Sequence, residues 1–182
     1  MANPKYIDFY QFDNEKVEQL LNSAQVENKN QGLLYTVLGG YDYDKSDSLI
    51  FDFINSNETY LQQTAVLCIG HLVRIHGEIN LTKYIPILEN ILANQIDFLV
   101  GNAEGAVNDI WIFYDREKIE QEVNKDSCVG RYFNVLQISE LSEEGKVYKK
   151  GIEKLQKLQI TESNPSIRSI QDTCIEFLNY SL

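Results

Sequence analysis

His71 and His76, the two histidines of the chain, are the first residues whose types could support chemistry. They lie five positions apart, which on a helix separates their directions by about 140°. A helical metal site needs histidines three or four positions apart, as in the H-E-x-x-H motif. We therefore expect no metal site here, and interpret both residues as packed or helix-capping side chains.

Carboxylates are the next candidates for chemistry, because paired acids can exchange protons with a substrate. Glu104, Asn108 and Asp109 fall close together within the expected helix 98–114. Neither a nucleophile nor a glycine-rich loop accompanies them, so the sequence predicts that the protein is not an enzyme and uses no cofactor. Glu104 and Asn108 remain candidates for contact with a partner on the exposed side of that helix.

The three cysteines, Cys68, Cys128 and Cys174, also lack a catalytic or metal-binding arrangement. The chain has no C-x-x-C pair, and an odd number of cysteines fits a reducing compartment better than a disulfide framework. Cys68 and Cys174 fall in apolar helical stripes, where cysteine serves as a small core residue.

A polar and aromatic segment at 41–47 is the strongest candidate for partner binding. Tyrosine offers a large contact area at low entropic cost, and carboxylates attract basic partners. We expect a loop here that presents its aromatic and acidic side chains, although a merely solvated loop is the alternative. The candidates in the segment are Tyr41, Asp42, Tyr43, Asp44 and Asp47.

Net charge narrows the class of partner. The chain of 182 residues has a formal net charge of −11, and residues 1–115 hold 16 acidic against 6 basic side chains. A nucleic-acid surface needs a basic footprint, so we expect no nucleic-acid partner. The beginning of the sequence has no apolar signal segment, and no apolar run is long enough to cross a membrane, so we expect a cytoplasmic protein without membrane contact.

The elements that must position these residues are helices. Apolar residues recur at helical spacing in segments 14–24, 33–40, 49–54, 58–76, 83–93 and 98–114, and less clearly in segments 116–124, 129–141 and 144–158 and after Asn164. Gly77 is placed to end helix 58–76, and Asn164 followed by proline is placed to begin the last helix. Gly70, Gly101 and Gly105 lie inside helices, where they suggest close packing of a neighbouring helix.

Breaks between these helices recur every 35–45 residues, the period of HEAT and armadillo repeats. No alternating apolar pattern long enough for a strand interrupts them. We therefore predict one all-α domain, residues 1–182, folded as a HEAT/armadillo-like α-α superhelix. An irregular helical bundle is the alternative.

Three segments resemble a family of bacterial HEAT-like repeat proteins, over roughly residues 28–114. They are QTAVLCIGHLVRIHG at 63–77, IPIL at 85–88 and AEGAVNDI at 103–110. The family patterns are A-x-x-C-x-G-H-L-A-R-x-H-G and A-E-D-A-L-D-D-I. The chain departs from them at Val73, Gly105 and Asn108, where the family has Ala, Asp and Asp.

The resemblance implies a binding function. Several such proteins resemble immunity proteins encoded beside bacterial toxins, so the leading hypothesis is a cytosolic immunity protein that neutralises a basic, nuclease-type toxin. A HEAT-like scaffold or adaptor without a toxin is the alternative, and a helical-repeat lyase or other enzyme is the third possibility. The resemblance also implies an inter-helix pair between Arg74 and Asp109.

Overall fold

The computed structural model describes residues 14–40 and 42–182, and this part of the chain is all-helical. Helices take up 80% of it, and it contains no strand, which confirms the predicted all-α class. The ten helices described are α1 (Asn14–Leu21), α2 (Val26–Leu38), α3 (Tyr43–Ile54), α4 (Thr59–His76), α5 (Leu81–Ala93), α6 (Asp97–Phe113), α7 (Arg116–Glu122), α8 (Cys128–Glu144), α9 (Tyr148–Thr161) and α10 (Pro165–Tyr180).

Two helices begin earlier than their apolar patterns predicted. α2 already starts at Val26, so the polar residues that directly follow Val26 belong to the helix and are not part of the connection between α1 and α2. α3 starts at Tyr43 because the side chain of Asp42 accepts a hydrogen bond from the Lys45 amide and caps the helix. The prediction that 41–47 is a loop is therefore wrong for residues 43–47, which form the first turns of α3.

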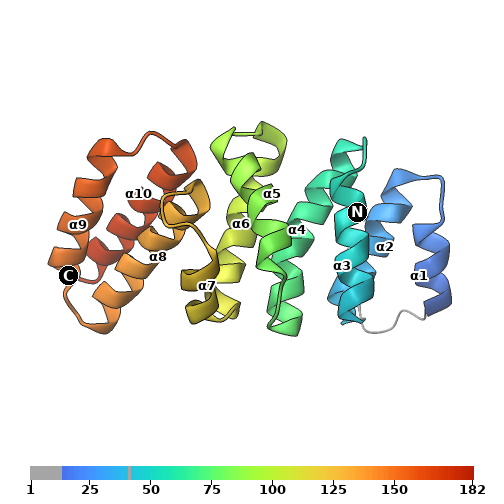
Figure 1. The fold of residues 1–182 in the computed structure, drawn as a ribbon, viewed down its shortest axis with the longest axis horizontal. Helices are drawn as coiled ribbons and strands as arrows, with labels where there is room; N and C mark the ends of the chain where they lie inside the picture. The colour runs from blue at the N-terminus through green and yellow to red at the C-terminus, as the bar shows by residue number, and fades with distance from the viewer. Residues whose placement is uncertain (1–13, 41) are drawn as a thin grey trace, which may run out of the picture.

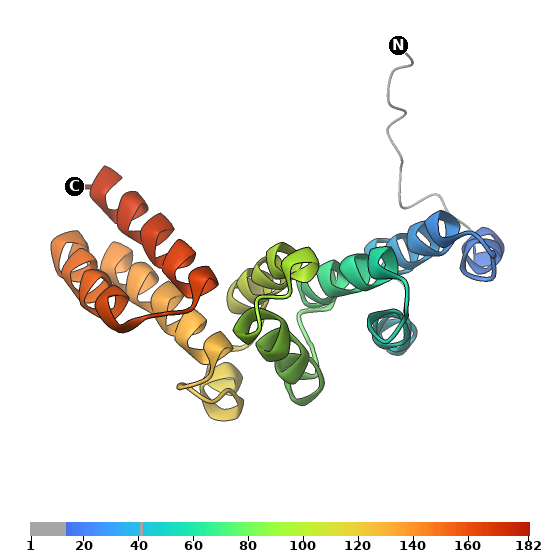
Figure 2. The same ribbon diagram turned by 90° about the horizontal axis from the view of Figure 1, so that it is seen from above.

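From α1 to α9 the helices follow one another in chain order along an elongated molecule, and α10 turns back to pack against α8 and α9 (Figure 1). Seen from above, α2, α4 and α6 lie side by side in one layer, with α3, α5 and α7 below them (Figure 2). At the C-terminal end α8, α9 and α10 pack against each other, while α8 also contacts α5 and α6. Helices in the middle of the molecule are therefore packed against neighbours from both layers.

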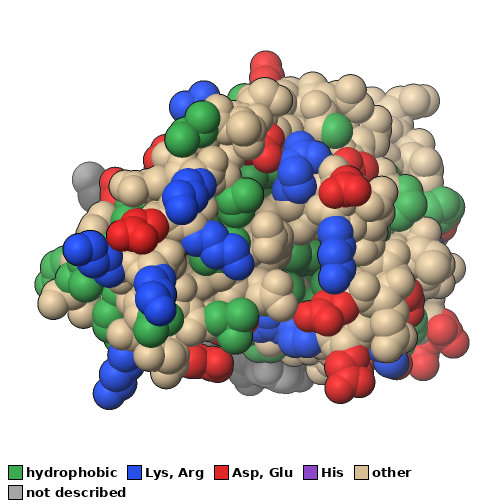
Figure 3. Space-filling view, turned by 60° about the vertical axis from the view of Figure 1, so that its left-hand side comes forward, with side chains coloured by type: hydrophobic (Ala, Val, Ile, Leu, Met, Phe, Trp, Pro, Cys, Tyr) green, Lys and Arg blue, Asp and Glu red, His purple; other side chains and the backbone are tan. Residues whose placement is uncertain are grey.

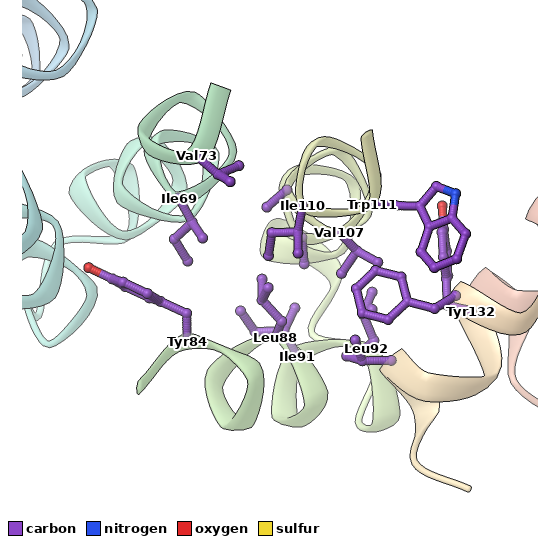
Figure 4. Packing of buried hydrophobic residues seen from close by; sticks show 14 of the residues in the cluster. Ile69, Val73, Tyr84, Leu88, Ile91, Leu92, Val107, Ile110, Trp111 and Tyr132 are labelled. Atoms are coloured by element: carbon purple, nitrogen blue, oxygen red, sulfur yellow. The ribbon is translucent and has the colours of Figure 1, made fainter. Parts of the chain in front are cut away.

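A continuous apolar core connects these layers from α2 to α10. Its middle part is formed where α4, α5, α6 and α8 meet (Figure 4). Ile69, Leu88 and Ile110 are fully buried there, and the Trp111 and Phe133 rings stack with centroids 5.5 Å apart. Burial of side chains of this size stabilises the fold by about 1.5–3 kcal/mol each.

Gly70 allows α4 and α6 to approach closely. A Cβ atom at this position would lie 3.2 Å from Ala106 Cα and 2.5 Å from Asp109 Oδ2. The expectation that Gly70 marks a helix contact is confirmed. Gly101 and Gly105 differ, because a Cβ at either would meet nothing within 4 Å, so the close packing expected at these two glycines is wrong.

Polar side chains fix the positions of the C-terminal helices. Glu89 of α5 accepts hydrogen bonds from the Cys128 and Val129 amides, at 2.7 and 2.8 Å, and so holds the N-terminus of α8. Asn164 caps α10 as predicted, and its amide group also donates to the Leu92 carbonyl at the end of α5. Gly77 ends α4 in the left-handed conformation, also as predicted.

No helix in the described ranges 14–40 and 42–182 has the length and apolar character that a membrane span requires.

Candidate protein-binding face

The structure separates the predicted partner-binding residues into two groups. Tyr41 lies outside the described residues. Asp42 and Asp44 are exposed at the beginning of α3, while Tyr43 is half-buried, with its ring edge against His76 and its hydroxyl accepting from the Asn80 amide at 3.2 Å. This group belongs to the α3 layer, whereas Glu104 and Asn108 belong to α6 in the other layer (Figure 2).

Asp47 is a structural residue, contrary to the expectation of a free loop carboxylate. It forms an ion pair with Lys83 Nζ and accepts a hydrogen bond from Tyr84 Oη at 2.7 Å, so it joins α3 to α5. Burial, and then the hydrogen bond to Asp47, raises the pKa of the Tyr84 hydroxyl. Tyr84 therefore remains protonated and keeps donating to the carboxylate. These contacts already occupy both carboxylate oxygens.

Arg74 of α4 and Asp109 of α6 form an ion pair, with Nη2 and Oδ2 2.6 Å apart. Arg74 is half-exposed and also lies over the Phe113 ring, 5.9 Å from its centroid. Burial and the charge of Arg74 lower the pKa of His71 on the same side of α4, although Asp109 opposes the shift. The pair connects α4 and α6 at their surface, next to the close contact at Gly70.

Exposed apolar and aromatic side chains accompany this pair along α4 and α6. Tyr60 is 54% exposed, Phe98 42% and Ile112 61%. Gln63 donates to the Phe98 carbonyl and Asn102 donates to the Gln63 carbonyl, so the two helices are tied together here as well. We call this surface the α4–α6 face. It consists of Tyr60, Leu67, His71, Arg74 and Ile75 of α4 and Phe98, Gly105, Asp109, Ile112 and Phe113 of α6.

Both helices contribute to the face at matching intervals. On α4 the intervals between Tyr60, Leu67, His71 and Arg74 are seven, four and three positions. The same intervals separate Phe98, Gly105, Asp109 and Ile112 on α6. Arg74 and Asp109 were identifiable from the sequence as an inter-helix pair, but the exposed apolar residues around them were not, because only the buried stripes of α4 and α6 were used to place apolar side chains. The opposite stripe of each helix was visible as a signal, since Tyr60, Leu67 and Phe98 are large apolar residues outside the core periodicity.

Glu104 and Asn108 border a groove between α6 and α10. The groove has a volume of about 340 Å³, and Tyr132 reaches it from α8. Asn108 donates to the Tyr132 hydroxyl at 3.4 Å. The groove is lined by Gly101, Glu104, Gly105, Asn108, Tyr132, Ser166, Ser169, Ile170 and Thr173. Beside both lining glycines the groove is open, because a Cβ at either would meet nothing within 4 Å.

A second pocket, of about 430 Å³, lies between α7, α8 and α9. Its apolar lining comes from Trp111, Phe133 and other buried side chains, and charged residues border it. Among these, Arg131 is already engaged by Glu162 at 2.9 Å and by the Asp126 carbonyl. The described lining contains neither a cysteine nor a histidine.

The buried thiols offer little nucleophilic character. Burial raises the pKa of Cys68 well above its ordinary value, and burial together with the charge of Glu89 raises the pKa of Cys128 to about 11. All three cysteines are buried and free. Within the described residues no three His, Cys, Asp or Glu side chains cluster as a metal site would require. The surfaces described above can offer contact area, hydroxyl groups and carboxylates.

Charge is distributed unevenly along the molecule. Of the cations in the described part of residues 1–115, Lys45, Arg74 and Lys83 are paired with acids of the same chain. At the other end α9 exposes Lys149, Lys150, Lys154 and Lys157. Figure 3 turns this C-terminal end toward the viewer and shows basic side chains interspersed with hydrophobic ones. The acidic excess is therefore concentrated away from α9.

Comparison of the chain with known protein families, with curated proteins and with solved structures finds no match.

Proposed function

We propose that this chain is a HEAT-like protein-binding module, and specifically an immunity protein that neutralises a basic, nuclease-type toxin by direct binding in the bacterial cytoplasm. The observation that carries the proposal is the α4–α6 face. Large apolar side chains on adjacent helices, around a half-exposed arginine, have the composition of protein interfaces. Exposed apolar residues that lie next to one another on one surface mark a binding site, whereas apolar residues scattered singly over a surface need no such explanation.

Polar contacts between successive helix pairs support the HEAT-like arrangement. Asp47 contacts Lys83, Arg74 contacts Asp109, and Glu89 contacts Cys128. These and the other links between α3 and α5, α4 and α6, and α5 and α8 join residues 35 to 40 positions apart. A contact that recurs at one sequence separation is expected where helical repeats of that length stack, and the upper end of these separations meets the period of HEAT units.

The charge distribution supports a basic partner. The chain carries a net charge of −11, with the excess in the part that contains the α4–α6 face. An acidic surface accelerates association with a basic protein and disfavours nucleic acid. A nuclease must itself be basic where it holds phosphate, so a protein of this charge can cover that surface.

A scaffold or adaptor function without a toxin is the alternative. The same face would serve it, and only the identity of the partner distinguishes the two functions. An enzyme is the third possibility, for which the pocket beside Trp111 would be the place to look.

Coexpression with the product of the adjacent reading frame tests the proposal. We expect that product to be toxic alone, to be tolerated with this protein, and to form a purifiable complex with it. Leu67→Glu and Phe98→Glu should each weaken the complex by about 30-fold or more, because each places a charge within an apolar contact.

Ile160→Glu is the matched control, since Ile160 is 83% exposed on α9 and receives the same change. It should bind as the wild type does. If no complex forms and growth is not rescued, the immunity function is wrong. If Leu67→Glu and Phe98→Glu bind as tightly as Ile160→Glu, the α4–α6 face is not the interface.

A further inference from the structure

The groove between α6 and α10 has the chemistry of a site for one cationic side chain. We propose that it receives an arginine side chain of the partner protein, with Glu104 as its counter-ion. This inference rests on the proposed function, because it names a contact that the partner would make. Its site lies beside the α4–α6 face, since Gly105 belongs to both.

The groove is open along its α6 side, beside Gly101 and Gly105. A Cβ atom at Gly101 or Gly105 would meet nothing within 4 Å, so α6 and α10 are not in contact at these positions. On the α10 side the lining residues are small and mostly hydroxylic. The resulting volume of about 340 Å³ is at the lower end of the range for small-ligand pockets, and one long side chain could enter it.

The groove has one negative charge and no positive one. Of its nine lining residues only Glu104 is charged, and Glu104 takes part in none of the ion pairs found in the described chain. Glu104 and Tyr132 line the groove together, and burial, followed by the charge of Glu104, raises the pKa of the Tyr132 hydroxyl. A half-buried carboxylate without a cation gains from receiving one.

Arginine fits the distribution of acceptors better than lysine does. The Glu104 carboxylate lies on the α6 side, and the hydroxyl oxygens of Ser169 and Thr173 lie on the α10 side. Thr173 donates its own hydroxyl hydrogen to the Ser169 carbonyl, which leaves its oxygen able to accept. A guanidinium presents five donors in a planar fork and can bond both sides at once, whereas an ammonium is a compact point charge.

Titration of the full chain with N-acetyl-arginine N-methylamide, followed by NMR, tests the groove without any partner. We expect saturable shifts of the amides of residues 101–108 and 166–173 at low salt. The neutral citrulline analogue should produce none, and the lysine analogue smaller ones. Shifts that do not saturate, that are scattered over the surface, or that are as large with lysine or citrulline would overturn the proposal.

Three variants make the test specific. Glu104→Gln should weaken arginine binding by about tenfold, because it removes the charge-assisted hydrogen bonds. Gly105→Leu should abolish binding while the melting temperature stays at least that of the wild type, because a Cβ at this position meets nothing within 4 Å and the larger side chain then takes up space in the groove. Asp52→Asn, an equal charge change at an exposed position of α3, should bind arginine as the wild type does. Equal affinity of Glu104→Gln and Asp52→Asn would show that the carboxylate has no part in binding.

The complex with the partner separates this inference from the proposed function. A complex that forms normally with Glu104→Gln but weakly with Leu67→Glu leaves the function intact and rejects the groove as the arginine site. A groove that binds the arginine derivative in a protein without any toxin partner leaves the groove intact and rejects the immunity function.

Discussion

Carboxylates hold helices of this protein together at several places. Asp47 joins α3 to α5, Glu89 joins α5 to the N-terminus of α8, and Glu162 binds Arg131 of α8 from the connection before α10. The Glu162 side chain is only 8% exposed and also accepts from the Ser163 and Asn164 amides. Burial alone would raise the pKa of Glu162, but the hydrogen bonds from Asn164 and Arg131 outweigh it and lower the pKa below its ordinary value.

Glu162→Gln should therefore lower the free energy of unfolding at neutral pH by about 1–3 kcal/mol, the usual contribution of hydrogen bonds to a charged group. Because the pKa is lower in the folded state, the contribution is fully present above the ordinary value of 4.5 and is lost as the pH falls through the folded-state pKa. Urea denaturation across this range measures the difference. Glu153→Gln, on the exposed side of α9, is the control and should differ little from the wild type at any pH. A Glu162→Gln deficit that persists unchanged in acid would mean that ionisation of Glu162 contributes nothing.

Helices α4 and α6 carry glycines that look alike locally but have opposite surroundings. Gly70 faces Ala106 and Asp109 of α6, while Gly105 faces the groove toward α10. Glycine inside a helix costs about 1 kcal/mol relative to good helix formers. At Gly70 the close approach of α4 to α6 offsets that cost, and at Gly105 no packing in the folded chain does.

Gly70→Leu should lower stability by about 1–3 kcal/mol through overpacking, despite the better helix propensity of leucine. Gly105→Leu should raise stability by up to about 1 kcal/mol, since it adds helix propensity at a position where a Cβ meets nothing within 4 Å. Chemical denaturation of both variants measures the two effects. Shifts of the same sign in the two proteins would contradict the packing described for α4 and α6.

The whole molecule is electrically asymmetric. Its acidic excess lies in residues 1–115, whereas the lysines of α9 lie at the C-terminal end shown in Figure 3. If the proposed basic partner is correct, the acids available to steer it are the exposed ones, because Asp47 is held by Lys83 and Asp42 caps α3. Asp44 and Asp52 remain exposed on α3, and their substitution would leave the Asp47–Lys83 ion pair and the Asp42 cap in place.

Asp44→Asn combined with Asp52→Asn should slow association with a basic partner at low salt by roughly two- to tenfold, part of the 10–1000-fold that electrostatic steering can supply. The difference should disappear at high salt, where charges are screened. Stopped-flow measurement of association rates at both salt concentrations tests this expectation. Lys150→Gln combined with Lys154→Gln is the control and should not slow association. Rates that equal those of the wild type at low salt would show that the α3 acids are only a solvated surface.

The all-α class, most of the helices and several of their ends were predictable from the sequence. The stripe of α4, the left-handed end at Gly77 and the cap at Asn164 depend on residues within a few positions of each other, so local periodicity and capping chemistry are sufficient to reveal them. The start of α3 was missed although Asp42 is a good cap, because the tyrosines and acids beside it resemble a loop.

Tertiary structure alone decided which side chains are available at the surface. Asp47 is occupied because Lys83 and Tyr84 pack beside it from 36 and 37 positions away, and neither partner can be identified from the residues around Asp47. Gly70 and Gly105 have the same local signal, and only the position of the neighbouring helix makes one a close contact and the other the wall of a groove. Sequence periodicity defines which side of a helix is apolar, but the free space and the partner charges that face it are set by helices far along the chain.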